Sequence, residues 1–115
     1  MKKHLILFFA ILTASIINAQ KIKPKFEKEG KLVKATYFYD SGQIKQQGFF
    51  NAEKLHDKWV SYDISGKKTA IAYYENGIKT GTWLFLDNGK VKEVTYNSNK
   101  IIDVKKLKDS SLAVY

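Results

Sequence analysis

The sequence predicts an all-β protein, an antiparallel meander of repeated β-hairpins, behind a secretory signal peptide. Short runs rich in Tyr, Phe, Val, Ile, Thr and Trp alternate with turn sequences that contain Gly or Asn. The gaps between the runs are too short for a helical crossover, so neighbouring strands are expected to pair antiparallel. The chain also repeats itself with a period of about 23 residues, which is typical of a repeat architecture.

The first 19 residues have the three parts of a cleavable signal peptide. Two lysines precede a nearly unbroken apolar run from Leu5 to Ile17. Cleavage is predicted between Ala19 and Gln20, because a small residue is preferred before the cut. A retained membrane anchor is the alternative, but an apolar run of about 13 residues is shorter than the roughly 20 that span a bilayer. We therefore expect export to the periplasm or beyond the cell.

The composition limits the classes of protein that remain. The chain has no cysteine, so it has no disulfide, thiolate metal site or lipid-modified cysteine. All 20 basic residues are Lys, and the absence of Arg argues against sequence-specific reading of nucleic acid. Removing 19 of the 115 residues leaves one domain with 18 Lys and 11 acidic residues. This excess favours anionic surfaces, although lysines that alternate with apolar residues are best explained as the solvated face of a sheet.

These patterns divide the chain into four parts. Residues 1–19 are the signal peptide, 20–31 a flexible basic leader, 32–105 the β-hairpin repeat domain, and 106–115 a C-terminal tail or short cap. Within the repeat domain, strands are predicted at 32–39, 43–50, 58–63, 67–74, 82–86, 90–96 and 101–105. The turn residues are predicted to supply the positive φ that tight hairpins need, and they are Gly42, Gly66, Asn76, Gly77, Asn88 and Gly89.

The repeat is clearest in its glycines and tryptophans. Gly42, Gly66 and Gly89 recur at nearly equal intervals, and the interval from Trp59 to Trp83 equals that from Gly42 to Gly66. One hairpin cannot bury its own aromatic face, so consecutive units must extend into one sheet. The aromatic side chains are expected to hold the units together or to form a binding surface, and those singled out are Trp59, Tyr62, Tyr74, Trp83, Phe85 and Tyr96.

The segment Tyr73-Tyr74-Glu75-Asn76-Gly77-Ile78-Lys79-Thr80-Gly81-Thr82-Trp83, followed by Asp87-Asn88-Gly89-Lys90, resembles the MORN-repeat variant. An upstream copy departs from the pattern, with Asp57 at the place of one family glycine and Glu53 at another. The resemblance covers residues 35–102 and implies a meander of hairpins with no catalytic residue and no cofactor. The family occurs in exported, antitoxin-like and scaffold proteins, so the resemblance does not imply a substrate.

Two small groups of polar residues suggest chemistry only weakly. His56 and Asp57, in a predicted turn, could act as an acid-base pair, but no nucleophile accompanies them and a solvated histidine is the simpler interpretation. Asp40, Asp63 and Asp87 precede turns and could suggest calcium. Each stands nearly alone, whereas a calcium site needs six or more oxygens, so hydrogen bonds that close the turns explain these residues better.

The sequence thus favours an exported, non-enzymatic binding or scaffolding module of the bacterial envelope or extracellular space, monomeric or weakly self-associating. Its partner is expected to be a protein, an envelope glycan or an anionic membrane surface, and no metal or cofactor is expected. An immunity or antitoxin-like protein that neutralises one partner is the alternative. A small nucleotidyltransferase of the nicotinate-mononucleotide adenylyltransferase type is disfavoured, because such enzymes need a parallel α/β sheet.

Overall fold

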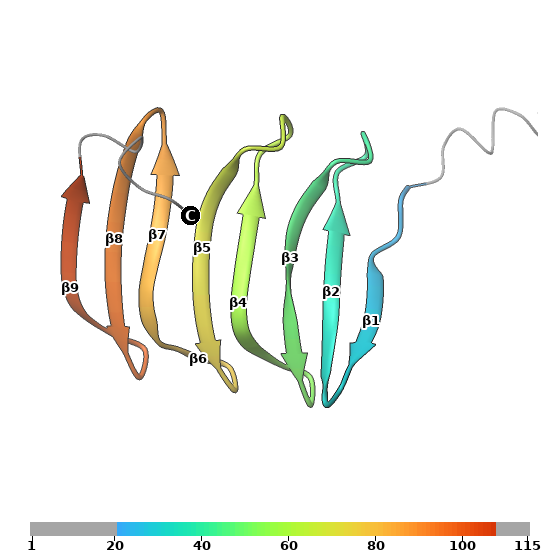
Figure 1. Ribbon diagram of the computed structural model, residues 1–115, viewed down its shortest axis with the longest axis horizontal. Helices are drawn as coiled ribbons and strands as arrows, with labels where there is room; N and C mark the ends of the chain where they lie inside the picture. Colours follow the sequence, from blue (N-terminus) through green and yellow to red (C-terminus); the bar gives the residue numbers. More distant parts are fainter. Residues whose placement is uncertain (1–20, 108–115) are drawn as a thin grey trace, which may run out of the picture.

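The computed structural model describes residues 21–107, which form one antiparallel sheet (Figure 1). The all-β meander is therefore confirmed. The predicted cleavage site at Ala19 and Gln20, and the tail beyond Leu107, lie outside the described residues. The strands are β1 (Lys25–Glu29), β2 (Leu32–Phe38), β3 (Ile44–Asn51), β4 (Lys54–Tyr62), β5 (Lys68–Glu75), β6 (Ile78–Lys79), β7 (Gly81–Asp87), β8 (Lys90–Asn97) and β9 (Lys100–Leu107).

Each strand lies beside its neighbour in the sequence, in the order β1-β2-β3-β4-β5-β7-β8-β9, and the short β6 also pairs with β5. β6 and β7 form one interrupted strand opposite β5. Gly81, with φ +69°, follows the interruption, and Asp57, one repeat earlier in β4, has φ +62°. The two positions that the repeat aligns therefore share the same unusual backbone conformation.

The leader predicted over residues 20–31 contains a strand that the sequence did not indicate. β1 pairs with β2 from Lys25 opposite Thr36 to Glu29 opposite Leu32. All five of its residues are exposed and four are charged, so β1 has no apolar alternation that would mark it as a strand. The first two residues of the predicted tail, Lys106 and Leu107, belong to β9.

The hairpin turns differ at the two ends of the sheet. At the lower end in Figure 1, three two-residue turns have positive φ at both positions: 47° and 68° at Ala52-Glu53, 47° and 85° at Asn76-Gly77, and 48° and 70° at Ser98-Asn99. The turn at Gly30-Lys31 has positive φ at Gly30 only. At the upper end, longer turns contain Gly42 and Gly66, whereas Asn88-Gly89 is again a two-residue turn. The interval from Gly66 to Gly89 is slightly shorter than that from Gly42 to Gly66, and it ends in this shorter turn.

We expect the double substitution Ala52→Asn, Glu53→Gly to stabilise the protein by about 1 kcal/mol, because side chains with a Cβ are strained in the left-handed region. The introduced residues would match the Asn76-Gly77 turn of the next unit. Urea denaturation of the mature chain measures the effect. The opposite change, Asn88→Ala with Gly89→Glu, is the matched control and should destabilise by a similar amount, since nothing lies within 4 Å of a Cβ at Gly89. Equal midpoints for all three chains would contradict the assignment of strain.

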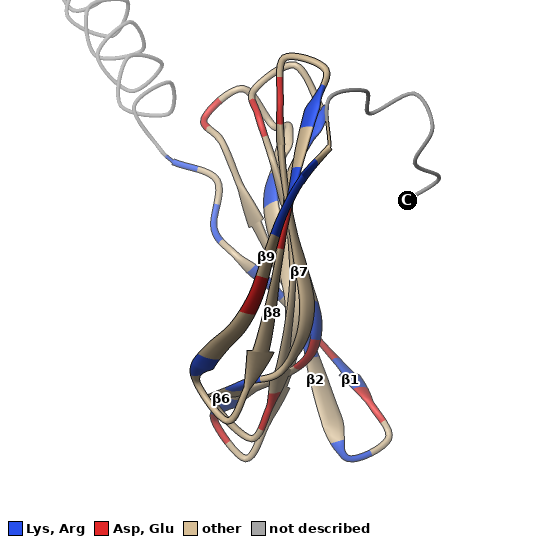
Figure 2. Cartoon of the chain, turned by 90° about the vertical axis from the view of Figure 1, so that its left-hand side faces the viewer, with Lys and Arg blue, Asp and Glu red and all other residues tan. Residues whose placement is uncertain are grey.

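The sheet is a single twisted layer over the described residues, so both of its faces are at least partly open (Figure 2). One face carries an aliphatic cluster in which Ile71 and Val91 are the most deeply buried. The cluster comprises Val60, Ile71, Leu84 and Val91, with Tyr62, Tyr73 and Leu86 packed around it. The alternation of side chains along each strand places Trp59 and Trp83 on the opposite face, which we call the aromatic face.

Candidate binding surface on the aromatic face

The aromatic face carries two ring clusters, one over each half of the sheet. In the first, the Trp59 ring lies against Phe50 with centroids 5.1 Å apart, and against Tyr37 at 6.5 Å. Phe26 of β1 meets Tyr37 edge-on at 6.2 Å. The second cluster comprises Tyr74, Trp83, Phe85 and Tyr96.

Trp59 is fixed in place by a glycine and a hydrogen bond. Gly48 lies beneath its ring, so closely that a Cβ at this position would overlap the ring atoms. The indole Nε1–H donates to the carbonyl of Phe49 at 2.9 Å. The register between β3 and β4 shifts by two residues at this point, between Gln47 and Phe49. The Trp59 side chain, 3% exposed, therefore packs where the regular ladder is interrupted.

Trp83 repeats the indole hydrogen bond of Trp59 one unit later, with Ala72 at the place of Gly48. Its Nε1–H is shared between the carbonyls of Tyr73, at 3.0 Å, and Thr80, at 3.1 Å. Its ring lies 4.7 Å from Tyr96 by centroid, and the Lys79 Nζ sits 5.2 Å from the centroid of Trp83. The ammonium group therefore lies within the range of a cation-π interaction.

The groups that this face offers to a partner are not the tryptophans. Trp59 and Trp83 are buried by their neighbours, whereas Phe26 is 58% and Phe85 38% exposed. The packing favours an inter-unit role for the two tryptophans. The accessible surface of this face is formed instead by the exposed rings and by the edges of their half-buried neighbours.

Tyr62, grouped from sequence with these aromatics, lies on the other face of the sheet. It packs against the aliphatic cluster of Val60 and Ile71. Tyr62 is three positions after Trp59, and an odd separation along a strand reverses the face. Three side chains that the sequence analysis did not single out lie with Trp59 on the aromatic face: Phe26, Tyr37 and Phe50.

Lysines accompany the exposed ring at the C-terminal end of the aromatic face. Lys92 lies directly opposite Phe85 in the pairing of β7 with β8, and Lys106 lies opposite Lys92 in β9. Because directly opposite residues share a face, these two ammonium groups flank Phe85 on one side. The surface around Phe85 therefore suits a partner that combines apolar area with negative charge.

His56 is a strand residue and not part of a turn, contrary to the prediction. It lies in β4, and its Nδ1 accepts a hydrogen bond from the Asn76 backbone N–H at 3.1 Å. The Asn51 side chain reaches the same turn, donating to Asn76 Oδ1 at 2.9 Å, and the Gly77 N–H donates to Leu55 O at 2.7 Å. These bonds give His56 a role in joining the turns of successive units.

The three turn-preceding aspartates do not occupy equivalent places. The turn bonds of Asp63 match those of Tyr39, not Asp40, while Asp87 ends β7 at a two-residue turn. Asp63 Oδ1 accepts hydrogen bonds from the Ser65 O–H at 2.6 Å and from the N–H groups of Ser65 and Lys67 at 3.0 Å. The Ser65 hydroxyl first, and then the Lys67 N–H, lower the pKa of Asp63 from its ordinary value of 3.8.

We expect Asp63 to make the stability of the folded protein depend on pH in the acidic range. Its folded pKa is lowered, so its contribution is present above its unfolded pKa, near pH 4, and is lost as the pH falls through the folded value. The wild-type Tm should therefore fall further than that of Asp63→Ala below about pH 4, so that the two values converge. Thermal unfolding between neutral pH and pH 2 measures this. Asp40→Ala is the matched control, and convergence of this control with wild type in the same way would contradict the assignment.

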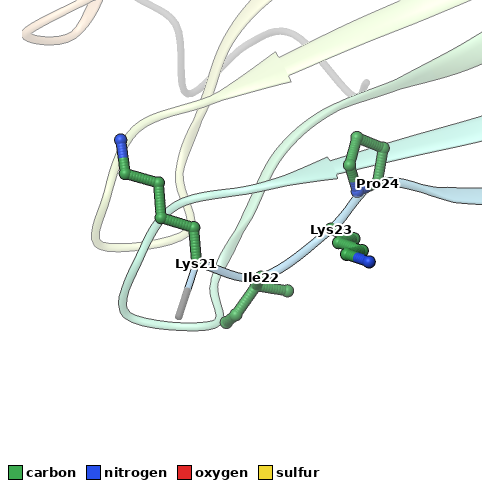
Figure 3. Close-up of a pocket in the computed structure, with 4 residues that line it drawn as sticks. All are labelled: Lys21, Ile22, Lys23 and Pro24. Carbon is green, nitrogen blue, oxygen red and sulfur yellow. The ribbon is translucent and has the colours of Figure 1, made fainter. Parts of the chain in front are cut away.

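A hollow beside the segment before β1 is lined by Lys21, Ile22, Lys23 and Pro24 (Figure 3). The two lysine side chains extend in different directions, and no set of polar groups converges there. Residues 21–107 contain no three His, Asp or Glu side chains placed to hold a metal ion. In the same range, no helix has the length and apolar character needed to cross a membrane.

No family model, curated protein or solved structure matches this chain.

Proposed function

We propose that the chain is an exported binding or scaffolding module of the bacterial envelope or extracellular space, and that its aromatic face contacts the partner. The observation that carries the proposal is the exposure of Phe26 and Phe85 on a face whose tryptophans are packed and hydrogen-bonded. Aromatic side chains have few rotatable bonds, so they offer large contact area at little cost in conformational entropy. Export is supported by the signal-peptide pattern of residues 1–19.

A non-enzymatic role is consistent with how the polar residues are used. His56 accepts a bond from a turn, and Asp63 closes a turn through three donors. Residues 21–107 pair antiparallel throughout, so they do not supply the parallel sheet that a nucleotidyltransferase needs. Turnover of a substrate by the mature chain, abolished by His56→Ala, would contradict this part of the proposal.

Capture of the mature chain from the cells that export it tests the proposal. A C-terminal tag, native expression and mass spectrometry identify its N-terminus and what accompanies it. Expected results are a chain that begins at Gln20 and a stoichiometric protein, glycan or anionic lipid. A protein bound one to one at moderate salt would favour the immunity hypothesis.

Substitutions on the aromatic face make the test specific. Phe26→Ser with Phe85→Ser should reduce recovery of the partner by about tenfold or more, as expected when aromatic anchors are removed. Ile64→Ser is the matched control, because Ile64 is 65% exposed but lies in the turn between β4 and β5. Equal recovery of the partner with the Phe26→Ser, Phe85→Ser variant and with the Ile64→Ser control would contradict the proposal. Recovery of no partner with the wild-type chain would also contradict it.

A further inference from the structure

β9 leaves one edge of the sheet without a neighbouring strand in the part of the chain that the structure describes (Figures 1 and 2). All eight of its residues are exposed. An uncovered strand presents a row of backbone N–H and C=O groups that can pair with another strand. Protein sheets usually protect such an edge with charge or keep it short.

The two edges of this sheet differ in how they are protected. The edge strand β1 has five residues, of which four are charged. β9 has eight, and its apolar side chains have large exposed fractions: 59% for Ile101, 62% for Ile102, 47% for Val104 and 40% for Leu107. Four of the eight residues of β9 are charged, against four of five in β1, so the edge at β9 is the longer and more apolar of the two.

The faces of β9 follow from its register with β8. Val104 lies opposite Val94 and belongs to the aromatic face, whereas Asp103 lies opposite Thr95 and Lys105 opposite Glu93 on the aliphatic face. Asp103 and Lys105 also approach each other within the strand, with Lys105 Nζ 3.9 Å from Asp103 Oδ2. An acid and a base thus stand on one face, on either side of Val104.

This order of residues suits antiparallel pairing with an identical strand. If a twofold axis passes beside Val104, Asp103 of each copy faces Lys105 of the other, and Val104 faces its own counterpart. If the axis passes beside Asp103, two aspartates face each other. If it passes beside Lys105, two lysines do. Like charges directly opposite are unfavourable and opposite charges are favourable, so one register is selected among the three.

We propose that two copies of this chain associate through β9 in that register and form one continuous sheet. An axis perpendicular to the sheet keeps each face on its own side, so both aromatic faces lie on the same side of the dimer. Glu93, Lys105 and Asp103 of the second copy then form an alternating row of charges across the junction. This inference goes beyond the binding role, because it adds self-association that brings two copies of the aromatic face together.

Sedimentation equilibrium of the mature chain tests the association. A single strand pair buries less than the roughly 1,200 Å² of a standard interface, so a monomer-dimer equilibrium in the micromolar to millimolar range is expected. A chain that stays monomeric at about 1 mM would overturn the proposal, since association weaker than this is worth less than about 4 kcal/mol. Open-ended growth with concentration would also overturn it, because a heterologous contact between β9 and β1 does not close.

Charge reversal identifies the strand and its register. In Asp103→Lys the introduced lysine faces Lys105 of the second copy, and in Lys105→Asp the introduced aspartate faces Asp103. Each variant alone should dimerise at least about tenfold more weakly than wild type, because two cross-strand attractions become repulsions. An equimolar mixture should restore a dimer that contains one copy of each, since both opposite-charge pairs return.

Asp40→Lys is the matched control for net charge, since it makes the same change in an exposed turn between β2 and β3. Its dimer should match wild type within about twofold, as expected of a charge distant from the interface. Recovery in the mixture also shows that both variants are folded. Dimers that persist unchanged in Asp103→Lys, or a mixture that stays monomeric while both variants keep the wild-type unfolding midpoint, would overturn the proposal.

Discussion

Trp83→Ala is expected to lower the free energy of unfolding by about 3–5 kcal/mol, the usual cost of truncating a buried aromatic side chain. The ring is 8% exposed and contacts the rings of Tyr74, Phe85 and Tyr96. Its loss would also leave the carbonyls of Tyr73 and Thr80 without the indole donor. Small domains are stable by only about 5–15 kcal/mol, so this one change removes a large share of the total.

Two comparison variants separate the contributions of the Trp83 side chain. Trp83→Phe keeps most of the ring area but removes the Nε1–H, and it should cost about 1–2 kcal/mol. Phe85→Ala removes a ring that is 38% exposed, and it should cost less than Trp83→Ala. Urea denaturation curves of the three variants give the order. An unchanged curve for Trp83→Ala would show that the ring is open to solvent and belongs to a binding surface.

The turns show how far local sequence predicts this fold. Asn76-Gly77 and Asn88-Gly89 were predicted because Asn and Gly tolerate positive φ, and the structure has positive φ at all four positions. Ala52-Glu53 adopts the same conformation without that chemistry. Its shape is imposed by the pairing of β3 with β4 and by the repeat, neither of which leaves a signal in the two residues themselves.

The aromatic side chains differ in how far the sequence predicts their face and their neighbours. The position of Tyr62 on the opposite face from Trp59 follows from counting along one strand, so it was predictable from the sequence. The proximity of Tyr74 to Trp83 depends on a two-residue shift between β5 and the interrupted strand β6-β7. The exposure of Phe26 depends on β1, whose charged residues give no strand pattern.

Gly48→Ala is expected to destabilise the protein by about 3 kcal/mol, although it adds only one methyl group. The nearest atoms to a Cβ at this position all belong to the Trp59 ring, which is held by its hydrogen bond to Phe49 O. Opposite Gly48 in β2 stands Ala35, which is 0% exposed, so the ring has no free space on that side. The ring must therefore lose its bond or its packing to admit the methyl group.

Comparison of repeats alone gives the opposite expectation for Gly48→Ala, because Ala72 stands at the equivalent place one repeat later. A double-mutant cycle with Trp59→Ala decides between the two. In the absence of the indole the added methyl group meets no ring, so Gly48→Ala should become neutral or slightly stabilising, as expected for Ala over Gly in a strand. The coupling energy between the two sites should then be about 3 kcal/mol. If the two substitutions have additive effects on the free energy of unfolding, the close approach of Gly48 to the Trp59 ring is contradicted.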